Sequence, residues 1–390
     1  MSKERQENNK NWNNKNSIIF FVLILFILVY PLIGGKIDTK VKLNGTVNQV
    51  ESPKLSVRTI LDGSYQATME SYVKENLPGR NLLIKMNNQL KYSLFNESSN
   101  SNVVIGKDKQ LYEPEYIDYS LNRWGGFSDD DVQQLIGKLD DLDSLLQSHG
   151  KQLYIFITPS KVRYYKNDIP WAYKLCLDSS NDDELAYDKF VEKAGGSSLN
   201  IFDSIAYIDS NRQSIDYPLW YSTGIHWSRA LGANVAEEFN KFLKNRSGYD
   251  LGQIQVSIKK TDKYIAPDTD LYDILNLIKR PQLDYYTPKV TYIEGTDKPN
   301  IFLRGGSFMG QSLSLLISAG EFNKDIHFEN NYYFVDGYSS QTTLSAFDAY
   351  GEIDVLTYLE QSDILVLEVN ESKINNMSWG FIDYVLENYK

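Results

Sequence analysis

The feature that most constrains the fold is an alternation of amphipathic helix patterns with short, wholly apolar segments. Residues 129–149 place leucines at helical spacing, and the pattern stops at Gly150. The next segment, residues 153–157, is entirely apolar, which is typical of a strand buried on both faces. The same alternation predicts helices over 182–195 and 229–244, and strands over 199–202, 301–303 and 363–369. Alternating strands and helices predict a three-layer α/β domain.

Two regions depart from this alternation. Residues 250–299 are irregular and rich in β-forming residues, so we expect a β-rich insertion. Residues 36–65 are polar and lack helical periodicity, which indicates a stalk. The folded domain is therefore expected to cover residues 66–390.

An apolar run at residues 18–33, followed by two glycines, indicates a membrane span. A helix over residues 18–35 would be roughly 27 Å long at about 1.5 Å per residue, close to the hydrocarbon thickness of a bilayer. Residues 1–17 hold four basic and two acidic residues, so the positive-inside rule places this tail in the cytoplasm. We expect an uncleaved signal anchor over residues 18–35, a single pass through the cell membrane, and an extracellular C-terminal domain.

Charge and composition narrow the function classes. The formal net charge is −11, and the basic tail leaves the remainder still more acidic, which argues against nucleic acid as a partner. The single cysteine, Cys176, excludes an internal disulfide framework. No His/Cys/Asp cluster has metal-ligand spacing, and no dinucleotide or phosphate-loop motif occurs. We therefore expect neither a metal nor a cofactor.

Two short segments carry the residue types of a nucleophilic site. His226, one of three histidines, stands beside Trp227, and Ser307 follows two glycines directly after the apolar segment 301–303. A serine hydroxyl needs an adjacent base, and glycines allow the tight turn that presents it at a strand end. We predict Ser307 as nucleophile and His226 as base, with the backbone N–H groups of Ser307 and Gly306 forming an oxyanion hole. Taken singly, each segment also fits a plain turn or a packed structural pair.

The flanking residues Trp227 and Arg304 are predicted to bind the substrate. The other histidines suit catalysis less well. His149 ends a predicted helix, where an imidazolium suits the helix dipole, and His327 lies in an ordinary apolar strand.

Seven segments, weak singly, follow one another in the order found in a known family. They are residues 72–80, 105–112, 157–161, 225–233, 269–275, 304–308 and 365–371. Through them the chain, from about residue 66 to 390, resembles the alginate O-acetyltransferase family of SGNH-hydrolase-like, membrane-associated proteins that acetylate bacterial exopolysaccharides. The resemblance implies an SGNH-hydrolase-like domain and a double displacement, in which Ser307 accepts an acetyl group and passes it to a polysaccharide hydroxyl. It also implies a multipass membrane O-acyltransferase as acetyl donor.

The chain departs from the family pattern at two glycines. The acid expected two residues before the histidine is Gly224, and the aspartate expected before the serine is Gly306. The first change removes the group that would orient the imidazole. Asp216, on the same loop, is the acid that we predict in its place. Two alternatives stay open: a catalytically degenerate glycan-binding or assembly component, and a secreted carbohydrate acetyl esterase.

Overall fold

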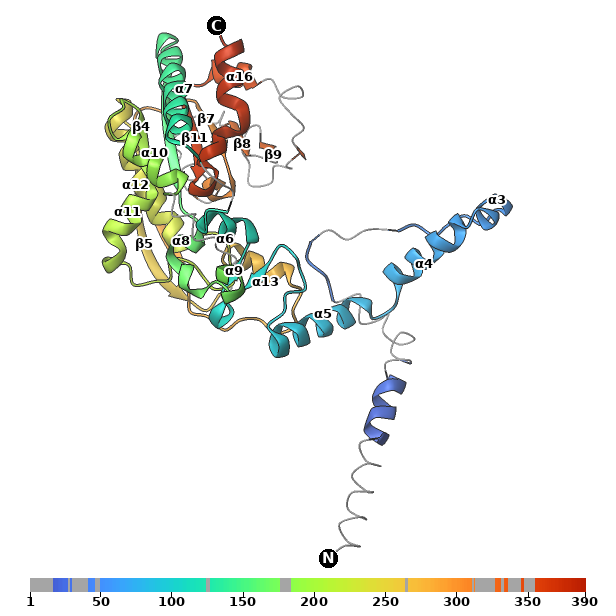
Figure 1. The fold of residues 1–390 in the computed structure, drawn as a ribbon. Coiled ribbons are helices and arrows are strands. Elements are labelled where there is room, and N and C mark those ends of the chain that lie inside the picture. The colour runs from blue at the N-terminus through green and yellow to red at the C-terminus, as the bar shows by residue number, and fades with distance from the viewer. Residues whose placement is uncertain are drawn as a thin grey trace, which may run out of the picture. The chain divides into compact units, whose positions relative to one another are not determined.

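The computed structural model divides the chain into two compact units (Figure 1). The smaller unit holds residues 1–101 with 272–281, and the larger holds residues 102–271 with 282–390. The structure describes residues 17–26, 29, 41–45, 50–123, 127–175, 184–263, 266–310, 312, 327–330, 333–335, 345–346 and 355–390. Cys176 and most of the predicted stalk up to residue 49 lie outside these residues.

A seven-stranded sheet, in the order β10-β9-β8-β7-β11-β3-β4, forms the centre of the larger unit. Strands β8, β7, β11, β3 and β4 run parallel, whereas β9 and β10 run antiparallel to their neighbours. The strands are β3 Gln152–Thr158, β4 Asn200–Asp203, β7 Ile301–Gly305, β8 His327–Asn330, β9 Tyr333–Val335, β10 Ser345–Ala346 and β11 Ile364–Asn370. The predicted strands in β3, β4, β7 and β11 are confirmed, and their carboxyl ends meet at one edge of the sheet.

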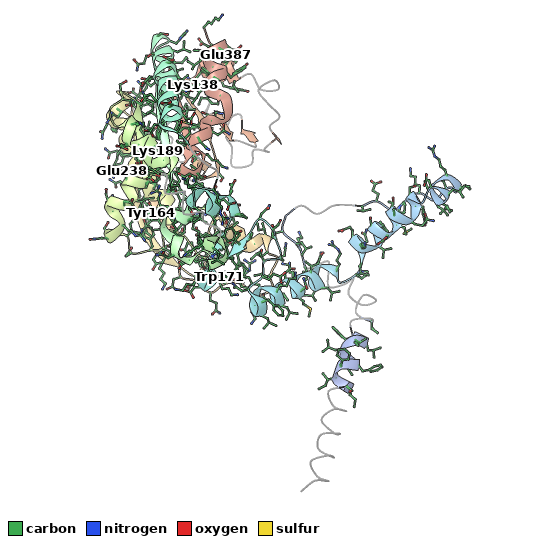
Figure 2. The ribbon with its side chains drawn as sticks, viewed as in Figure 1. Lys138, Tyr164, Trp171, Lys189, Glu238 and Glu387 are labelled. Carbon is green, nitrogen blue, oxygen red and sulfur yellow. The ribbon has the colours of Figure 1, made fainter. Side chains whose placement is uncertain are left out.

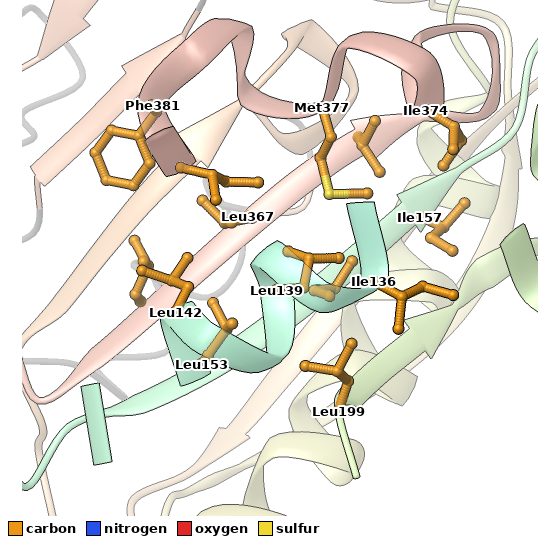
Figure 3. Close-up of a cluster of buried hydrophobic side chains, with 14 of the residues drawn as sticks. Ile136, Leu139, Leu142, Leu153, Ile157, Leu199, Leu367, Ile374, Met377 and Phe381 are labelled. Carbon is orange, nitrogen blue, oxygen red and sulfur yellow. The ribbon is translucent and has the colours of Figure 1, made fainter. Parts of the chain in front are cut away.

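Side chains alternate between the two faces of the sheet, which places the core. On one face, apolar residues of β3 and β11 pack against α7 Asp129–Ser148, α10 Ala186–Ala194 and α16 Phe381–Asn388. Figure 3 shows this cluster, including Leu139, Leu142, Leu153, Leu367 and Phe381. On the other face, Phe156 of β3 stacks on Phe239 of α12 Arg229–Ser247, with ring centroids 4.7 Å apart. Helices on both faces make the predicted three-layer α/β domain.

The helix α7 illustrates why these segments are helical. Ser128 caps its N-terminus by accepting a hydrogen bond from the N–H of Asp131, whose side chain accepts in return from the N–H of Ser128. The helix ends before Gly150, which has a φ of 71°. Lys138 of this helix forms an ion pair with Asp383 of α16, with Nζ 2.6 Å from Oδ1, and Glu387 of α16 is exposed (Figure 2).

The predicted insertion is a two-stranded antiparallel ribbon with a helical excursion. Strand β5 Gln253–Thr261 pairs with β6 Tyr285–Ile293 along its whole length. Between the strands lie η5 Ala266–Thr269 and α13 Asp270–Ile274. The ribbon is fixed to α12, because the N–H of Val256 donates to Glu237.

Shorter elements complete the larger unit. Strands β1 Val104–Ile105 and β2 Leu111–Tyr112 form an antiparallel hairpin, joined by η2 Lys107–Lys109. The remaining helices are α6 Pro114–Ser120, α8 Lys161–Tyr165, η3 Lys166–Asp168, α9 Trp171–Leu175, α11 Ser204–Asn211, η4 Arg212–Ser214, α15 Val355–Gln361 and η6 Glu371–Gly380.

The smaller unit contains several helices among its described residues. It contains α3 Val57–Leu61, α4 Ser64–Asn76, α5 Arg80–Leu90 and the π-helical turn η1 Lys91–Phe95. The end of the predicted stalk is therefore helical: Ser56 caps α3 through Thr59 although the segment has no apolar period. Residues 17–26 are also helical, and much of the rest of the predicted anchor lies outside the described residues. Within the described part of the chain, no helix combines the length and the apolar character needed to cross a membrane.

Candidate active site

A chain of two hydrogen bonds joins a serine, a histidine and an aspartate at the carboxyl edge of the sheet. His226 Nε2 lies 2.6 Å from Ser307 Oγ, and His226 Nδ1 lies 2.5 Å from Asp270 Oδ2. Ser307 follows β7, His226 precedes α12, and Asp270 begins α13 in the β5–β6 excursion. Ser307 is exposed, and the side chains of His226 and Asp270 keep 19% and 28% of their accessible surface. The structure thus brings together Ser307 and His226, as the sequence predicted, and adds an acid.

The loop before α12 holds His226 through its own hydrogen bonds. Ser228 caps α12 by accepting from the N–H of Leu231 at 3.2 Å, and its own N–H donates to the carbonyl of Leu219 at 2.8 Å. The indole Nε1 of Trp220 donates to the carbonyl of Ile225 at 3.0 Å. The histidine is therefore fixed on both sides by backbone contacts.

A buried lysine forms hydrogen bonds with the same loop. Lys161 begins α8, directly after β3, and its side chain is inaccessible to solvent. Its Nζ donates to the carbonyls of Tyr221 at 2.8 Å and Gly224 at 3.0 Å, and also contacts those of Ser222 and Leu111. Burial lowers the pKa of Lys161 to about 7, while the charge of Asp270 acts in the opposite direction. The lysine thus ties the end of β3 to the histidine loop.

Asp270 is bound at both of its carboxylate oxygens. Oδ2 faces the imidazole, while Oδ1 accepts from the N–H groups of Ile225 at 2.9 Å and Leu271 at 2.7 Å. The backbone of Asp268, more than Asp270 itself, restricts the space at the glycine two residues before the histidine. A Cβ at Gly224 would lie 3.4 Å from Asp270 Oδ1 and 3.0 Å from the carbonyl oxygen of Asp268. The carboxylate of Asp270 therefore reaches the space beside Gly224 from another part of the chain.

The segment that carries Asp270 is anchored by Asp268, which is 1% exposed. Its carbonyl accepts from the hydroxyl of Thr223 at 2.7 Å, and its Oδ1 accepts from the N–H of Arg229 at 3.0 Å. Burial raises the pKa of Asp268 to about 7, although the contacts with Arg229 act against this. Its Oδ2 is buried and has no hydrogen-bond partner among the described residues. Asp268 therefore links the excursion to both ends of the histidine loop.

The prediction of Asp216 as the triad acid is corrected by this arrangement. Asp216 is exposed, and the position at His226 Nδ1 is occupied by Asp270. Proximity along the loop is a poor guide here, because the acid arrives from 44 residues downstream through the packing of the excursion.

Trp227 belongs to the core and not to a binding surface. It is 0% exposed and contacts Phe308 edge-on, with ring centroids 5.5 Å apart and planes at 85°. Phe308 in turn lies against the ring of His226, with centroids 4.8 Å apart. The prediction that Trp227 binds substrate is therefore wrong for this structure, and the tryptophan instead supports the aromatic packing beside the imidazole.

Arg304 is also buried, on the face of the sheet that packs against α16. It is 3% exposed, its Nε donates to the carbonyl of Ser378 at 3.2 Å, and its guanidinium lies 4.9 Å from the ring centroid of Phe381. Alternation along β7 puts Arg304 on the same face as Phe302, which belongs to the cluster under α16. The prediction that Arg304 binds substrate is corrected for this reason.

The hydrogen bonds of the turn that carries Ser307 exclude one of the two predicted oxyanion-hole donors. The N–H of Gly306 donates to Glu368 Oε2 at 2.5 Å, so this donor is already occupied. Residues 307–310 are helical, and first-turn N–H groups lack intrahelical acceptors. Ser307 N–H therefore stays as the predicted donor, and Gly306 is removed from that role.

Sequence reasoning missed three residues at this edge: Asp270, Glu368 and Lys161. Each lies in a segment that resembles the family: Lys161 in residues 157–161, Asp270 in 269–275 and Glu368 in 365–371. Burial of Glu368 and Lys161 is not visible from residue type, since both are usually exposed. In the described residues, no group of three or more His, Cys, Asp or Glu side chains is placed to hold a metal ion.

The fold and the site together define a class: α/β proteins with a Ser–His–Asp arrangement at the carboxyl edge of a parallel sheet. Residues 103–312, more than half of the chain, match the family of SGNH hydrolase-like domains described as acetyltransferase AlgX. The chain belongs to this family. The matched region includes all three residues of the hydrogen-bonded chain.

One curated relative and two solved structures give further likenesses. A Pseudomonas putida protein described as "Probable alginate O-acetylase AlgJ" is 24% identical over 219 residues, which cover 56% of this chain and 53% of that protein. The chain thus spans about half the length of this relative. The solved O-acetyltransferase domain of Pseudomonas putida AlgJ aligns at 17% identity over 75% of this chain and 100% of that domain, with a TM-score of 0.45. Bacillus cereus PatB1 aligns at 11% identity over 70% of this chain and 97% of that chain, with a TM-score of 0.41.

Proposed function

We propose that the protein is a membrane-anchored extracellular O-acetyltransferase that moves an acetyl group through an acetyl-serine onto a polysaccharide hydroxyl. The observation that carries this proposal is the continuous contact from Ser307 through His226 to Asp270. Family membership supports acetyl as the transferred group, and the name of the Pseudomonas putida relative supports a polysaccharide acceptor. The apolar run at residues 18–33 supports the anchor.

In the first half-reaction, Ser307 Oγ attacks the acetyl carbonyl while His226 Nε2 takes the hydroxyl proton. Asp270 accepts a hydrogen bond from Nδ1–H, which keeps the Nε2 lone pair directed at Ser307 and stabilises the imidazolium. The tetrahedral oxyanion forms beside the N-terminus of the helical turn 307–310, where the Ser307 N–H can donate to it. The imidazolium then gives its proton to the departing donor group, and acetyl-Ser307 remains.

In the second half-reaction, a sugar hydroxyl enters in place of the departed donor group. His226 Nε2 takes its proton while the sugar oxygen attacks the acetyl carbonyl of Ser307. Collapse of the intermediate releases the acetylated sugar, and the proton returns to Ser307 Oγ. The donor in this proposal is a multipass membrane O-acyltransferase that delivers acetyl groups to the outer face.

Because Ser307 is exposed, water can reach it, and this favours a second candidate function. If water reaches acetyl-Ser307 as readily as a sugar does, the same site is a carbohydrate acetyl esterase. The degenerate binding component was suggested by the missing acid at Gly224, and the contact between Asp270 and His226 now supplies an acid.

The test is turnover of a chromogenic acetyl ester by the full chain, with and without an added oligosaccharide. Ser307→Ala is expected to lower kcat by at least about 10³-fold, because the acetyl-enzyme cannot form. Ser257→Ala, which removes an exposed serine from β5, is the matched control and is expected to leave turnover unchanged. Equal turnover in wild type and Ser307→Ala would contradict the proposal.

The product that forms distinguishes the transferase reaction from the esterase reaction. Acetyl on the oligosaccharide supports the transferase, whereas free acetate with an unmodified oligosaccharide supports the esterase. Absence of turnover in the wild type, together with saturable oligosaccharide binding, would support the binding component instead.

A further inference from the structure

A second buried carboxyl lies at the nucleophile turn, outside the hydrogen-bonded triad. Glu368 is in β11, between β7 and β3, and its side chain is 2% exposed. Its Oε1 accepts from the hydroxyl of Thr158 at 2.5 Å, and its Oε2 accepts from the N–H of Gly306 at 2.5 Å. The carboxyl therefore joins the end of β3 to the residue directly before Ser307.

The surroundings of Glu368 indicate that its carboxyl has a specific role at the nucleophile turn. A fully buried carboxyl is costly unless its hydrogen bonds are made. Burial raises the pKa of Glu368, whereas the hydrogen bonds from Thr158 and Gly306 and the charge of His226 act to lower it. The carboxyl is thus held in place by two hydrogen bonds, one of which comes from the backbone of the turn.

The two glycines before Ser307 are shaped around this side chain. A Cβ at Gly305 would lie 2.5 Å from Glu368 Cβ, which no real contact tolerates. A Cβ at Gly306 would lie 3.3 Å from Glu368 Oε2 and would push on the carboxylate. The space beside both glycines is therefore filled by Glu368, and a larger residue at either position would displace it.

We propose that Glu368 is a positioning residue for the nucleophile: its carboxyl holds the N–H of Gly306 and thereby keeps Ser307 Oγ within hydrogen-bond distance of His226. The inference rests on the proposed acyl-transfer function. Glu368 touches no reacting atom in this account. It acts through the backbone of the turn, in the space that a side chain at position 306 would take.

The test compares Glu368→Ala with Glu368→Gln in the full chain. Removal of the carboxyl lets the turn relax, and a small displacement of a nucleophile lowers kcat on the order of 100-fold. The KM for the ester is expected to change less than about threefold, because substrate contacts are untouched. Glu368→Gln is expected to stay within about fivefold of wild type. Its amide oxygen can accept from Gly306 while its NH2 group donates to Thr158 Oγ1.

A double-mutant cycle with Gly306→Ala tests whether the side chain of Glu368 occupies the space that a side chain at position 306 would need. The added methyl group is expected to lower kcat about tenfold in the wild type but less than about twofold in the Glu368→Ala background, where the clash is gone. Melting temperatures of all variants distinguish a loss of activity caused by unfolding from one caused by displacement of Ser307. A Glu368→Ala enzyme that is folded and retains kcat within about threefold would overturn the proposal. Equal losses in Glu368→Gln and Glu368→Ala would also overturn it, because the amide keeps both contacts.

Amide hydrogen exchange distinguishes failure of this inference from failure of the proposed function. If the wild type and Ser307→Ala are equally inactive, the acyl-transfer function fails, yet the contact can still be measured. Exchange at Gly306 is expected to accelerate on the order of 100-fold in Glu368→Ala relative to the β7 amide of Leu303. Unchanged exchange at Gly306 would contradict the positioning role whatever the activity.

Discussion

The histidine loop and the nucleophile turn each have a glycine where the family pattern has an acid, and each receives a carboxyl from elsewhere in the chain. Asp270 reaches Gly224 and remains 28% exposed, in contact with the imidazole. Glu368 reaches Gly306 and is fully buried, in contact with a backbone N–H. The two replacements are therefore chemically different. In the proposed mechanism, the first carboxylate stabilises charge that develops on the imidazole, and the second is proposed to stabilise a backbone conformation.

The difference predicts how each site responds to substitution. An acid that stabilises a developing imidazolium should affect the rate strongly and the fold weakly. A carboxyl that holds a turn should tolerate a neutral group of the same shape. Substitutions at both sites therefore test whether the two carboxyls differ in this way.

The largest effect is expected at Asp270. Asp270→Asn should lower kcat by about 10³–10⁴-fold, by analogy with the effect of removing the acid in other Ser–His–Asp sites. The two N–H groups of Ile225 and Leu271 require the amide oxygen, so the NH2 group would face His226 Nδ1 and favour the wrong tautomer. Steady-state kinetics on the acetyl ester measure this effect.

Asp216→Asn is the matched control for that measurement. Its side chain is exposed, and kcat is expected to stay within about twofold of wild type. A strong loss in Asp216→Asn with little loss in Asp270→Asn would reverse the assignment of the acid.

An intermediate effect is expected at Lys161. Lys161→Met removes the donor shared by four carbonyls. Those of Tyr221 and Ser222 keep a backbone N–H partner, so the expected cost is about 1–3 kcal/mol for each buried group left unsatisfied. We expect a lower melting temperature and a fall in kcat of about 10–100-fold, because the histidine loop loses its anchor. Lys166→Met, which removes a single bond to the carbonyl of Ser120, is the control. Wild-type kcat in a folded Lys161→Met protein would show that the loop needs no such anchor.

The smallest effect is expected at Asp268, in the pH dependence of stability. The raised pKa means that folded Asp268 holds its proton up to about pH 7, while the unfolded chain releases it near pH 4. Between these values the folded state binds more protons, so the stability contributed at this site falls as the pH rises. Asn does not titrate, and its amide oxygen can still accept from the N–H of Arg229.

Asp268→Asn should therefore gain in melting temperature over wild type as the pH is raised from 4 to 8, by roughly 2–4 °C for about 1 kcal/mol. Differential scanning calorimetry across this range measures the gain. A difference between the two proteins that is constant with pH would show that Asp268 titrates normally. The exposed Asp216→Asn again serves as the control, with no expected trend.

Much of the fold was predictable because its signals are local. The helices at α7 and α12 and the strands at β3, β7 and β11 follow from apolar periodicity, capping residues and terminal glycines. The pairing of Ser307 with His226 was also accessible, since a serine after a strand and a histidine before a helix both belong at the carboxyl edge of such a sheet.

What the sequence did not yield depends on packing between distant segments. Asp270 meets His226 only because the excursion folds back onto the histidine loop, and no local pattern encodes that return. Trp227 and Arg304 were assigned to substrate by residue type, although their exposure is decided by tertiary contacts. Strand alternation alone could have placed Arg304 with Phe302 on the far face, because both belong to the same short strand.

The attachment of the triad acid to the β5–β6 excursion has a practical consequence. Shortening this segment would look like routine trimming of an irregular insertion, and it would leave the central sheet, the serine and the histidine in place. It would nevertheless delete the carboxylate at His226 Nδ1. A partner that binds the ribbon would contact the same part of the chain that supplies this carboxylate.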